Sequence, residues 1–235
     1  MIKEAVILAG GLGTRLQSVV SDRPKCMALV NGKPFLHYLV EFLKKSGIQK
    51  FLFSVGYLHE SIEEYLRSEY SNLQYKISVE TEPLGTGGAV KLACQHASEK
   101  NLLVCNGDTL FKVDVVSLYE LHLSRSSNCT LCLKLMQNFD RYGVVTLNED
   151  DTVKSFHEKK FYESGLINGG VYAVNAVNFM KENLPDKFSF EKDYLENNTA
   201  LQYGDTPKLY GIIQDKYFID IGIPEDYERA GRELK

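Results

Sequence analysis

The sequence predicts an α/β fold, a Rossmann-like, doubly wound sheet that is mixed but mainly parallel. Three observations lead to this prediction. Short apolar runs alternate with helical periods over the first half of the chain. A glycine-rich segment directly follows the first apolar run, as in the first strand-to-helix turn of doubly wound sheets. After residue 125, strand-like runs follow one another with little helix between them, which indicates antiparallel pairing in the second half.

Four strands, each followed by a helix, are expected in the first half. The strands are predicted at residues 3–9, 51–55, 74–79 and 102–105. The first helix runs from Pro34 to a stop at Gly47, with apolar residues at the spacing i, i+3, i+4, i+7. The other helices are marked by apolar positions within residues 58–66, from about Thr86 to residue 97, and within 115–122. This alternation requires parallel strands joined by right-handed crossovers.

The second half is dominated by strand-like runs. They are predicted at residues 130–135, 143–147, 152–156, 167–174, 208–213 and 217–221. Helical patterns lie at residues 176–183, 191–196 and 224–234. No linker, low-complexity tract or internal repeat interrupts the chain, so we expect a single domain over residues 1–235, made of the halves 1–125 and 126–235.

The composition excludes several classes of protein. No apolar run approaches the roughly 20 residues of a membrane span, and the N-terminus has no signal-peptide layout, so we expect a cytoplasmic protein without a membrane partner. The net charge of −4 argues against nucleic acid as a partner. Cys129 and Cys132 form a CxxC pair on a predicted strand, where residues three apart face opposite sides. We therefore expect both in the core, and all five cysteines reduced.

The glycine-rich segment Gly10-Gly11-Leu12-Gly13-Thr14-Arg15-Leu16 has the composition of a phosphate-binding loop. Glycines let backbone N–H groups approach a polyphosphate closely, and the planar cation of Arg15 suits phosphate oxygens. Lys25 adds a second cation from the same loop. Two other phosphate motifs fail, because Leu16 stands where a dinucleotide fingerprint needs its third glycine and no Gly-Lys-Ser/Thr sequence occurs.

A second segment, residues 79–88, follows the third predicted strand and is rich in small residues. Small residues allow a flat base to lie against the backbone, with Leu84 as an apolar cover. An equally complete interpretation is that Thr86 caps the helix that follows.

Two carboxylates at predicted strand ends suggest a metal site. Asp108 follows the fourth strand in Asn106-Gly107-Asp108, and Asp220 lies in an apolar run, where a carboxylate is costly unless it is paired or metal-bound. Mg²⁺ is usually held by one or two carboxylates together with substrate phosphates. Glu225 and Asp226 are expected in the first turn of the last helix, where negative charge suits the helix dipole.

Taken together, these segments resemble the sugar-1-phosphate nucleotidylyltransferase family. The matching residues are, in order, 10–15 followed by 24–25, then 82–88, 106–108, 142–143, 158–159, 168–170 and 218–222. They run through nearly the whole chain in the right order, so the resemblance is more specific than any single motif. One position departs from it: Ile223 stands where the family commonly has threonine, and no role is carried over to it.

The resemblance implies roles for individual residues. Catalysis is expected from Arg15, Lys25 and Asp108, with Mg²⁺ as cofactor on Asp108 and Asp220. A nucleoside triphosphate is expected to contact Leu8, Ala9, Gly10, Gly11, Gly13, Thr14, Glu80, Pro83, Gly85, Thr86, Asn106 and Gly107. A sugar 1-phosphate is expected to contact Gly143, Glu158, Lys159, Asn168 and Gly169. Residues 1–125 then bind the nucleotide and residues 126–235 the sugar phosphate.

The sequence favours particular substrates and leaves several alternatives open. Guanine presents two adjacent N–H donors that one carboxylate can accept, so Glu80 or Glu82 favours GTP. Segments 16–20, 82–89 and 166–170 resemble the branch that uses D-glycero-α-D-manno-heptose 1-phosphate for bacterial surface polysaccharides. Guanylyl transfer to mannose 1-phosphate, uridylyl or thymidylyl transfer, a non-catalytic nucleotide-sugar sensor and a glycosyltransferase stay open. So does the oligomeric state, with a homodimer among the alternatives.

Overall fold

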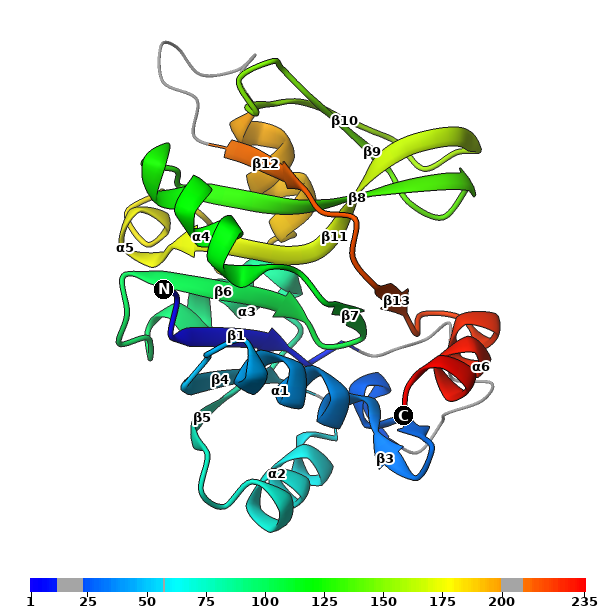
Figure 1. The fold of residues 1–235 in the computed structure, drawn as a ribbon. Helices are drawn as coiled ribbons and strands as arrows, with labels where there is room; N and C mark the ends of the chain where they lie inside the picture. Colours follow the sequence, from blue (N-terminus) through cyan, green and yellow to red (C-terminus); the bar gives the residue numbers. More distant parts are fainter. Residues whose placement is uncertain (12–22, 57, 200–208) are drawn as a thin grey trace.

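The computed structural model describes residues 1–11, 23–56, 58–199 and 209–235. Within these residues, nine strands form one mixed sheet whose main path runs β10-β9-β11-β6-β1-β4-β5 (Figure 1). The predicted doubly wound, mainly parallel architecture is confirmed for the first half. There β1 (Glu4–Leu8) lies between β4 (Lys50–Val55) and β6 (Asn101–Asn106), parallel to both, and β5 (Gln74–Val79) extends the parallel set.

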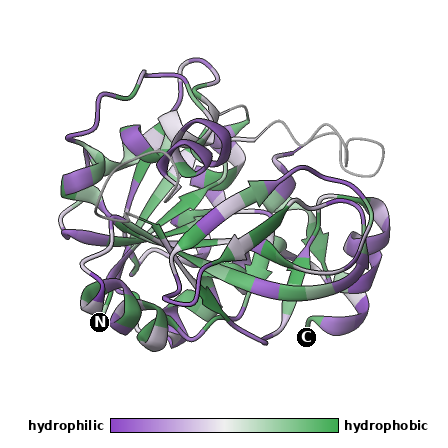
Figure 2. Ribbon diagram, turned by 90° about the horizontal axis from the view of Figure 1, so that it is seen from above, coloured by the Kyte–Doolittle hydropathy of each residue, from purple (hydrophilic) through white to green (hydrophobic). Residues whose placement is uncertain are grey.

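Helices cover both faces of this parallel region because alternate residues of each buried strand point to opposite sides. Ile7 of β1 packs in one core with α1 (Phe35–Lys45), α2 (His59–Glu69) and α4 (Val115–Ser124). Val6 packs in a second core with α3 (Gly85–Cys94) and α5 (Ala176–Phe179). In Figure 2 the strands are mostly hydrophobic, whereas polar residues gather on helices and loops toward the periphery.

The second half adds antiparallel strands to the same sheet. A long β11 (Tyr162–Asn175) pairs with β6, with β8 (Cys129–Phe139) and with β9 (Val144–Leu147), and β10 (Val153–His157) pairs with β9. β12 (Leu209–Ile213) runs parallel to β8. Strands β8 and β11 extend beyond the predicted apolar runs. Their outer ends are not apparent in the sequence because they are half-exposed and carry polar side chains. The division into halves at residue 125 stays a prediction.

The prediction for the two cysteines of the CxxC pair is confirmed. Cys129 is buried in the core shared with α3, and Cys132 is buried in the core shared with α1. Both thiols are free, and burial raises the pKa of each. They lie on one strand, β8, with their side chains on opposite faces of the sheet, so this pair cannot close a disulfide or share a metal.

Two helical predictions are wrong in extent or type. The helix expected at 176–183 ends after one turn, as α5. The segment expected to be helical at 191–196 forms a π-helical turn, Phe190–Leu195, followed by a 3-10 turn, Glu196–Asn198. Here Phe190, Tyr194 and Leu195 are all fully buried, which overrides the local preference for an ordinary α-helix.

Of four very short strands, three escape prediction from the sequence, and only the last falls within a predicted run, at residues 217–221. β2 (Leu29–Val30) and β3 (Lys33–Pro34) form one pair, and β7 (Thr109–Phe111) and β13 (Phe218–Asp220) form another, with Asp220 opposite Thr109. Strands of two or three residues carry no readable periodicity. The ribbon of β7 and β13 brings the C-terminal part of the chain to the carboxyl end of β6, and helix α6 (Pro224–Glu233) follows it (Figure 1).

Candidate active site

A cleft of about 860 Å³ opens at the carboxyl ends of β1, β4, β5 and β6. This is where doubly wound sheets bind their ligands, and the size is that of a typical small-molecule site. Many of the predicted nucleotide contacts lie together in its lining. They are Leu8, Ala9, Gly10, Gly11, Glu80, Pro83, Gly85, Thr86, Asn106 and Gly107, joined by Lys25 and Asp108.

The strand exits pack so closely in this cleft that Gly107 requires glycine and Gly10 leaves little room for a side chain. A Cβ atom on Gly107 would lie 2.7 Å from the carbonyl oxygen of Leu8, and one on Gly10 would lie 2.7 Å from Oε1 of Glu80. The contact at Gly107 is with rigid backbone and excludes a side chain, whereas at Gly10 the Glu80 side chain can move and the backbone nitrogen of Gly56, 3.2 Å from the Cβ position, sets the limit. The glycines therefore bring the ends of β1, β5 and β6 together, and they do so before any ligand is considered.

An ion pair lies at the β6 end of the cleft. Nζ of Lys25 donates a hydrogen bond of 2.7 Å to Oδ2 of Asp108, and the Lys25 side chain is only 11% exposed. Lys25 reaches this point because a 3-10 turn, Lys25–Met27, anchors the chain through the buried side chains of Cys26 and Met27. The sequence placed Lys25 beside a triphosphate; in the structure it also neutralises a predicted metal ligand.

Asp220 converges on the same place, as predicted. Burial and the negative charge of Asp108 raise the pKa of Asp220, which requires the two carboxylates to be near one another. The pairing of β13 with β7 places Asp220 opposite Thr109, and the backbone N–H of Ile221 donates to the carbonyl oxygen of Asp108 at 3.0 Å. Asp108 lines the cleft and Asp220 lies close to it, and two carboxylates that repel one another in this way fit a hard divalent cation.

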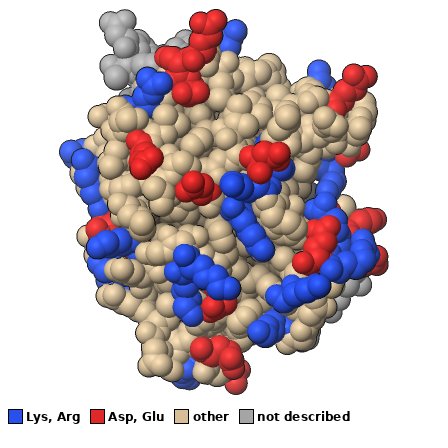
Figure 3. Space-filling view, in the orientation of Figure 1, with Lys and Arg blue, Asp and Glu red and all other residues tan. Residues whose placement is uncertain are grey.

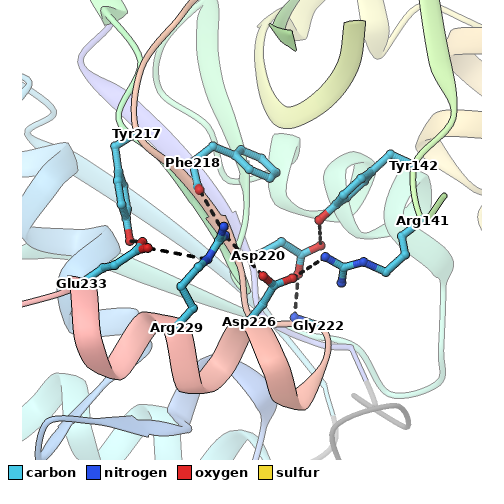
Figure 4. A network of polar contacts seen from close by, with 9 residues as sticks. All are labelled: Arg141, Tyr142, Tyr217, Phe218, Asp220, Gly222, Asp226, Arg229 and Glu233. Carbon is cyan, nitrogen blue, oxygen red and sulfur yellow. Dashed lines mark hydrogen bonds and ion pairs between the residues drawn. The ribbon is translucent and has the colours of Figure 1, made fainter. Parts of the chain in front are cut away.

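The orientation of Asp220 is fixed on both oxygens (Figure 4). The backbone N–H of Gly222 donates to Oδ1 at 2.7 Å, and the hydroxyl of Tyr142 donates to Oδ2 at 3.2 Å. Beside it, Asp226 is not simply a dipole-complementing residue in the first turn of α6, as the sequence suggested. It is buried, accepts a hydrogen bond from the guanidinium of Arg141 in an ion pair, and lies 3.3 Å from the guanidinium of Arg229.

Of the two candidates for base recognition, Glu80 is the better placed. It lines the cleft half-buried against Gly10, and the backbone N–H of Leu84 donates to its Oε2 at 3.0 Å. Burial raises the pKa of Glu80, whereas Glu82 lines the same cleft as an exposed residue. A half-buried carboxylate with one oxygen held by the backbone is a pre-oriented acceptor.

Of the two interpretations of residues 79–88, the one in which Thr86 caps α3 is wrong. The N-cap residue is Leu84, without a side-chain hydrogen bond. The hydroxyl of Thr86 instead donates to Oε2 of Glu191 at 2.7 Å and accepts from the backbone N–H of Phe190 at 2.9 Å. The small residues that follow also have a structural role: Cβ atoms on Gly87 and Gly88 would lie 2.2 Å from the Phe188 ring and the Asp186 carbonyl oxygen. Residues 186–190 therefore pack directly against the first turn of α3.

The predicted sugar-phosphate contacts lie outside the lining of this cleft. They are nevertheless close to one another, because β9 pairs with both β10 and β11, through Val144 opposite His157 and Ile167. Gly143 precedes β9, Glu158 and Lys159 follow β10 as exposed residues, and Asn168 and Gly169 lie in β11. The amide of Asn168 donates to the Tyr172 hydroxyl at 2.8 Å. Their contact with a sugar stays a prediction.

Three predicted residues, Gly13, Thr14 and Arg15, lie outside the residues that the structure describes. Conversely, the sequence reasoning missed Gly56, which follows β4 and lines the cleft, and it gave no role to Tyr142. A signal existed for each. Gly56 comes directly after a predicted strand, as Gly10 does, and Tyr142 belongs to the Tyr142-Gly143 pair that carries part of the family resemblance.

The family follows from this fold and site together with a match of residues 4–235 to the nucleotidyl transferase family, to which the chain belongs. It is an enzyme of the nucleotidyltransferase class. Among curated relatives, it is 49% identical over 232 residues to D-glycero-alpha-D-manno-heptose 1-phosphate guanylyltransferase of Aneurinibacillus thermoaerophilus, covering 99% of this chain and 98% of the relative. It is 47% identical over 224 residues to the Campylobacter jejuni enzyme of the same name, covering 95% and 96%.

A solved structure agrees over the whole chain. The crystal structure of HddC from Yersinia pseudotuberculosis matches with a TM-score of 0.88 and 37% identity, covering 100% of both chains. The same protein complexed with GMP-PN matches with a TM-score of 0.87.

Two further observations concern partners. Among the helices that the structure describes, none is both long and apolar enough to cross a bilayer. On the face drawn in Figure 3, basic and acidic side chains are interspersed.

Within the described ranges, no group of three or more His, Cys, Asp or Glu side chains is arranged to hold a metal ion. A divalent cation would therefore need phosphate oxygens beside the two aspartates, which is the usual mode for Mg²⁺.

Proposed function

We propose that this enzyme transfers a guanylyl group from GTP to D-glycero-α-D-manno-heptose 1-phosphate, giving GDP-heptose and pyrophosphate. The observation that carries the proposal is the cleft that joins Glu80 at one end to Lys25 and Asp108 at the other. A carboxylate suited to guanine and a cation suited to phosphate thus share one nucleotide-sized space. The names of the relatives with 49% and 47% identity support the same choice of base and sugar.

The reaction needs positioning and charge neutralisation more than proton transfer. An oxygen of the sugar 1-phosphate attacks the α-phosphorus of GTP in line, a new P–O bond forms, and the bond to pyrophosphate breaks. The nucleophile is already an anion, so no general base is required. The barrier lies in bringing two polyanions together and in stabilising the charge on the group being transferred.

The chain's own residues meet these needs in a definite arrangement. Lys25, held by Asp108 just after the carboxyl end of β6, presents a nearly buried ammonium group to the phosphates. Glu80, held by the N–H of Leu84, presents its remaining acceptor to the base. Asp108 and Asp220 are the residues that would hold Mg²⁺, which when bound supplies positive charge to the phosphates. Arg15 is proposed to add a second cation to the triphosphate.

The sugar phosphate is proposed to lie toward β9, β10 and β11. Lys159 is proposed to contact its phosphate, and Gly143, Glu158, Asn168 and Gly169 its hydroxyl groups. Support comes from the pairing of the three strands, which brings these residues side by side although they span 27 positions of the chain, from 143 to 169. We further propose that residues 1–125 bind the nucleotide and residues 126–235 the sugar phosphate.

The test is a substrate panel read as pyrophosphate release. GTP, ATP, UTP and dTTP are each combined with heptose, mannose and glucose 1-phosphates in the presence of MgCl₂. We expect the highest kcat/KM for GTP with the heptose 1-phosphate. Mannose 1-phosphate is the competitor to include, because a Mycobacterium tuberculosis relative named mannose-1-phosphate guanylyltransferase is 31% identical over 235 residues. A preference for UTP or dTTP would refute the assignment of the base.

A further inference from the structure

A tyrosine from the second half of the chain reaches one of the two carboxylates that we propose bind the metal ion. Tyr142 lies between β8 and β9, immediately before Gly143, and its hydroxyl donates to Oδ2 of Asp220 at 3.2 Å (Figure 4). Tyr142 and Asp220 are 78 positions apart in the chain. This contact therefore joins the turn that precedes the predicted sugar contacts to the carboxylate that the β13 segment brings in.

The position of the Tyr142 ring is determined by packing. It lies edge-to-face with Phe218 at a centroid distance of 6.1 Å and is tilted against Phe139 at 6.4 Å. The guanidinium carbon of Arg141 lies 5.4 Å from its centroid. A ring held on several sides loses little freedom when its hydroxyl binds, so the hydrogen bond to Asp220 is a pre-set one.

The turn that carries Tyr142 is itself tied to α6. Arg141 pairs with the buried carboxylate of Asp226, and Asp226 lies in the first turn of α6, six residues after Asp220. Asp220 is thus held on one oxygen by its own chain, through Gly222, and on the other by the turn between β8 and β9. Each carboxylate oxygen keeps one lone pair for another partner.

We infer that Tyr142 is a positioning residue for the divalent cation: its hydroxyl fixes the rotation of the Asp220 carboxylate so that Asp108 and Asp220 bind the ion together. Groups that orient metal ligands by hydrogen bonds typically change metal affinity or activity by about 10- to 100-fold when they are removed. The inference rests on the proposed function. It gives Tyr142 a role in metal binding, and this role does not depend on a contact between Tyr142 and the substrate.

The test compares Tyr142→Phe with a matched control, Tyr217→Phe. Tyr217 is also a half-buried tyrosine beside α6, but its hydroxyl donates to Oε2 of Glu233 at 2.9 Å, away from Asp220 (Figure 4). Both changes remove one hydroxyl and keep the ring and its packing. Binding of a GTP analogue with a methylene bridge between the α- and β-phosphorus atoms is measured by calorimetry, once in EDTA and once in saturating MgCl₂.

We expect the wild-type enzyme and Tyr217→Phe to bind the analogue more tightly with magnesium than without. In Tyr142→Phe this magnesium-dependent gain should shrink by about 10- to 100-fold, while the affinity in EDTA stays at the wild-type value. In turnover, the MgCl₂ concentration for half-maximal rate should rise by a similar factor, and excess MgCl₂ should restore kcat.

Three results would overturn the inference. One is an unchanged magnesium-dependent gain in Tyr142→Phe. Another is an equal loss of affinity in EDTA, which would mean that the hydroxyl supports the nucleotide pocket itself. The third is a lower kcat that excess MgCl₂ does not restore. Failure of the proposed function looks different, since it would appear in the wild-type enzyme as absent guanylyl transfer in the substrate panel.

Discussion

We propose that the choice of GTP depends on the charge of Glu80, and Glu80→Gln tests this proposal directly. The backbone N–H of Leu84 holds Oε2 of Glu80. A glutamine there keeps an oxygen for this N–H and must turn its NH₂ group toward the base. An acceptor then becomes a donor facing the two N–H donors of guanine, whereas the carbonyl oxygens of uracil and thymine accept from it.

The size of the effect follows from the bonds that change. A hydrogen bond to a charged partner contributes about 1.5–3 kcal/mol. Loss of one such bond in the transition state corresponds to a fall of roughly 10- to 150-fold in kcat/KM for GTP. The kcat/KM for UTP should stay constant or rise, so that the ratio between the two nucleotides carries the result.

The thermal stability of Glu80→Gln should not fall together with its kcat/KM for GTP. Burial raises the pKa of Glu80, so the folded state binds its proton more tightly than the unfolded state does. The contribution of Glu80 to stability therefore falls as pH rises from the usual carboxyl pKa through the raised one. At pH 8, a neutral glutamine avoids this cost, and we expect the melting temperature of Glu80→Gln to be no lower than that of the wild-type enzyme.

The assay is steady-state pyrophosphate release with GTP and with UTP, accompanied by thermal unfolding at pH 5 and pH 8. Glu82→Gln is the matched control, because Glu82 lines the same cleft but is exposed. An unchanged preference for GTP in Glu80→Gln, or a loss of preference in Glu82→Gln instead, would refute the reasoning.

Three further predictions concern the rest of the molecule. Asp108→Asn should keep the melting temperature within a few degrees and reduce turnover by about 10²- to 10³-fold, by analogy with the loss of one charge-stabilising group; near-wild-type turnover would reject Asp108 as a metal ligand. Gly88→Ala should destabilise the fold by about 1–3 kcal/mol in urea unfolding, because the new Cβ would lie 2.2 Å from the carbonyl oxygen of Asp186; wild-type stability would contradict the packing. Burial lowers the pKa of His122 from 6.5 to about 4. The unfolded state then binds more protons, so roughly 3 kcal/mol of stability should be lost as pH falls through this window, and His122→Asn should show a flatter pH profile of unfolding free energy.

Much of the fold can be predicted because its signals are local. The strand at 74–79 was predicted to the residue, and the first three helices within a few positions, since burial of one face imposes a readable period. Where burial and period disagree, prediction fails. The π-helical turn at Phe190–Leu195 is an example, because its shape follows from how its aromatic residues pack on Phe179 and Tyr172.

By itself, the sequence determined the class of fold, the glycine-rich strand exits and the two aspartates, because each depends on residue type and short spacing. Tertiary structure alone decided how these groups meet. The three-residue pairing of β13 with β7 places Asp220 beside Asp108, and packing of segment 186–190 accounts for Thr86, Gly87 and Gly88. The hydrogen bond from Tyr142 to Asp220 likewise joins distant positions. Such contacts are held by packing around them, and packing leaves no periodic trace in the chain.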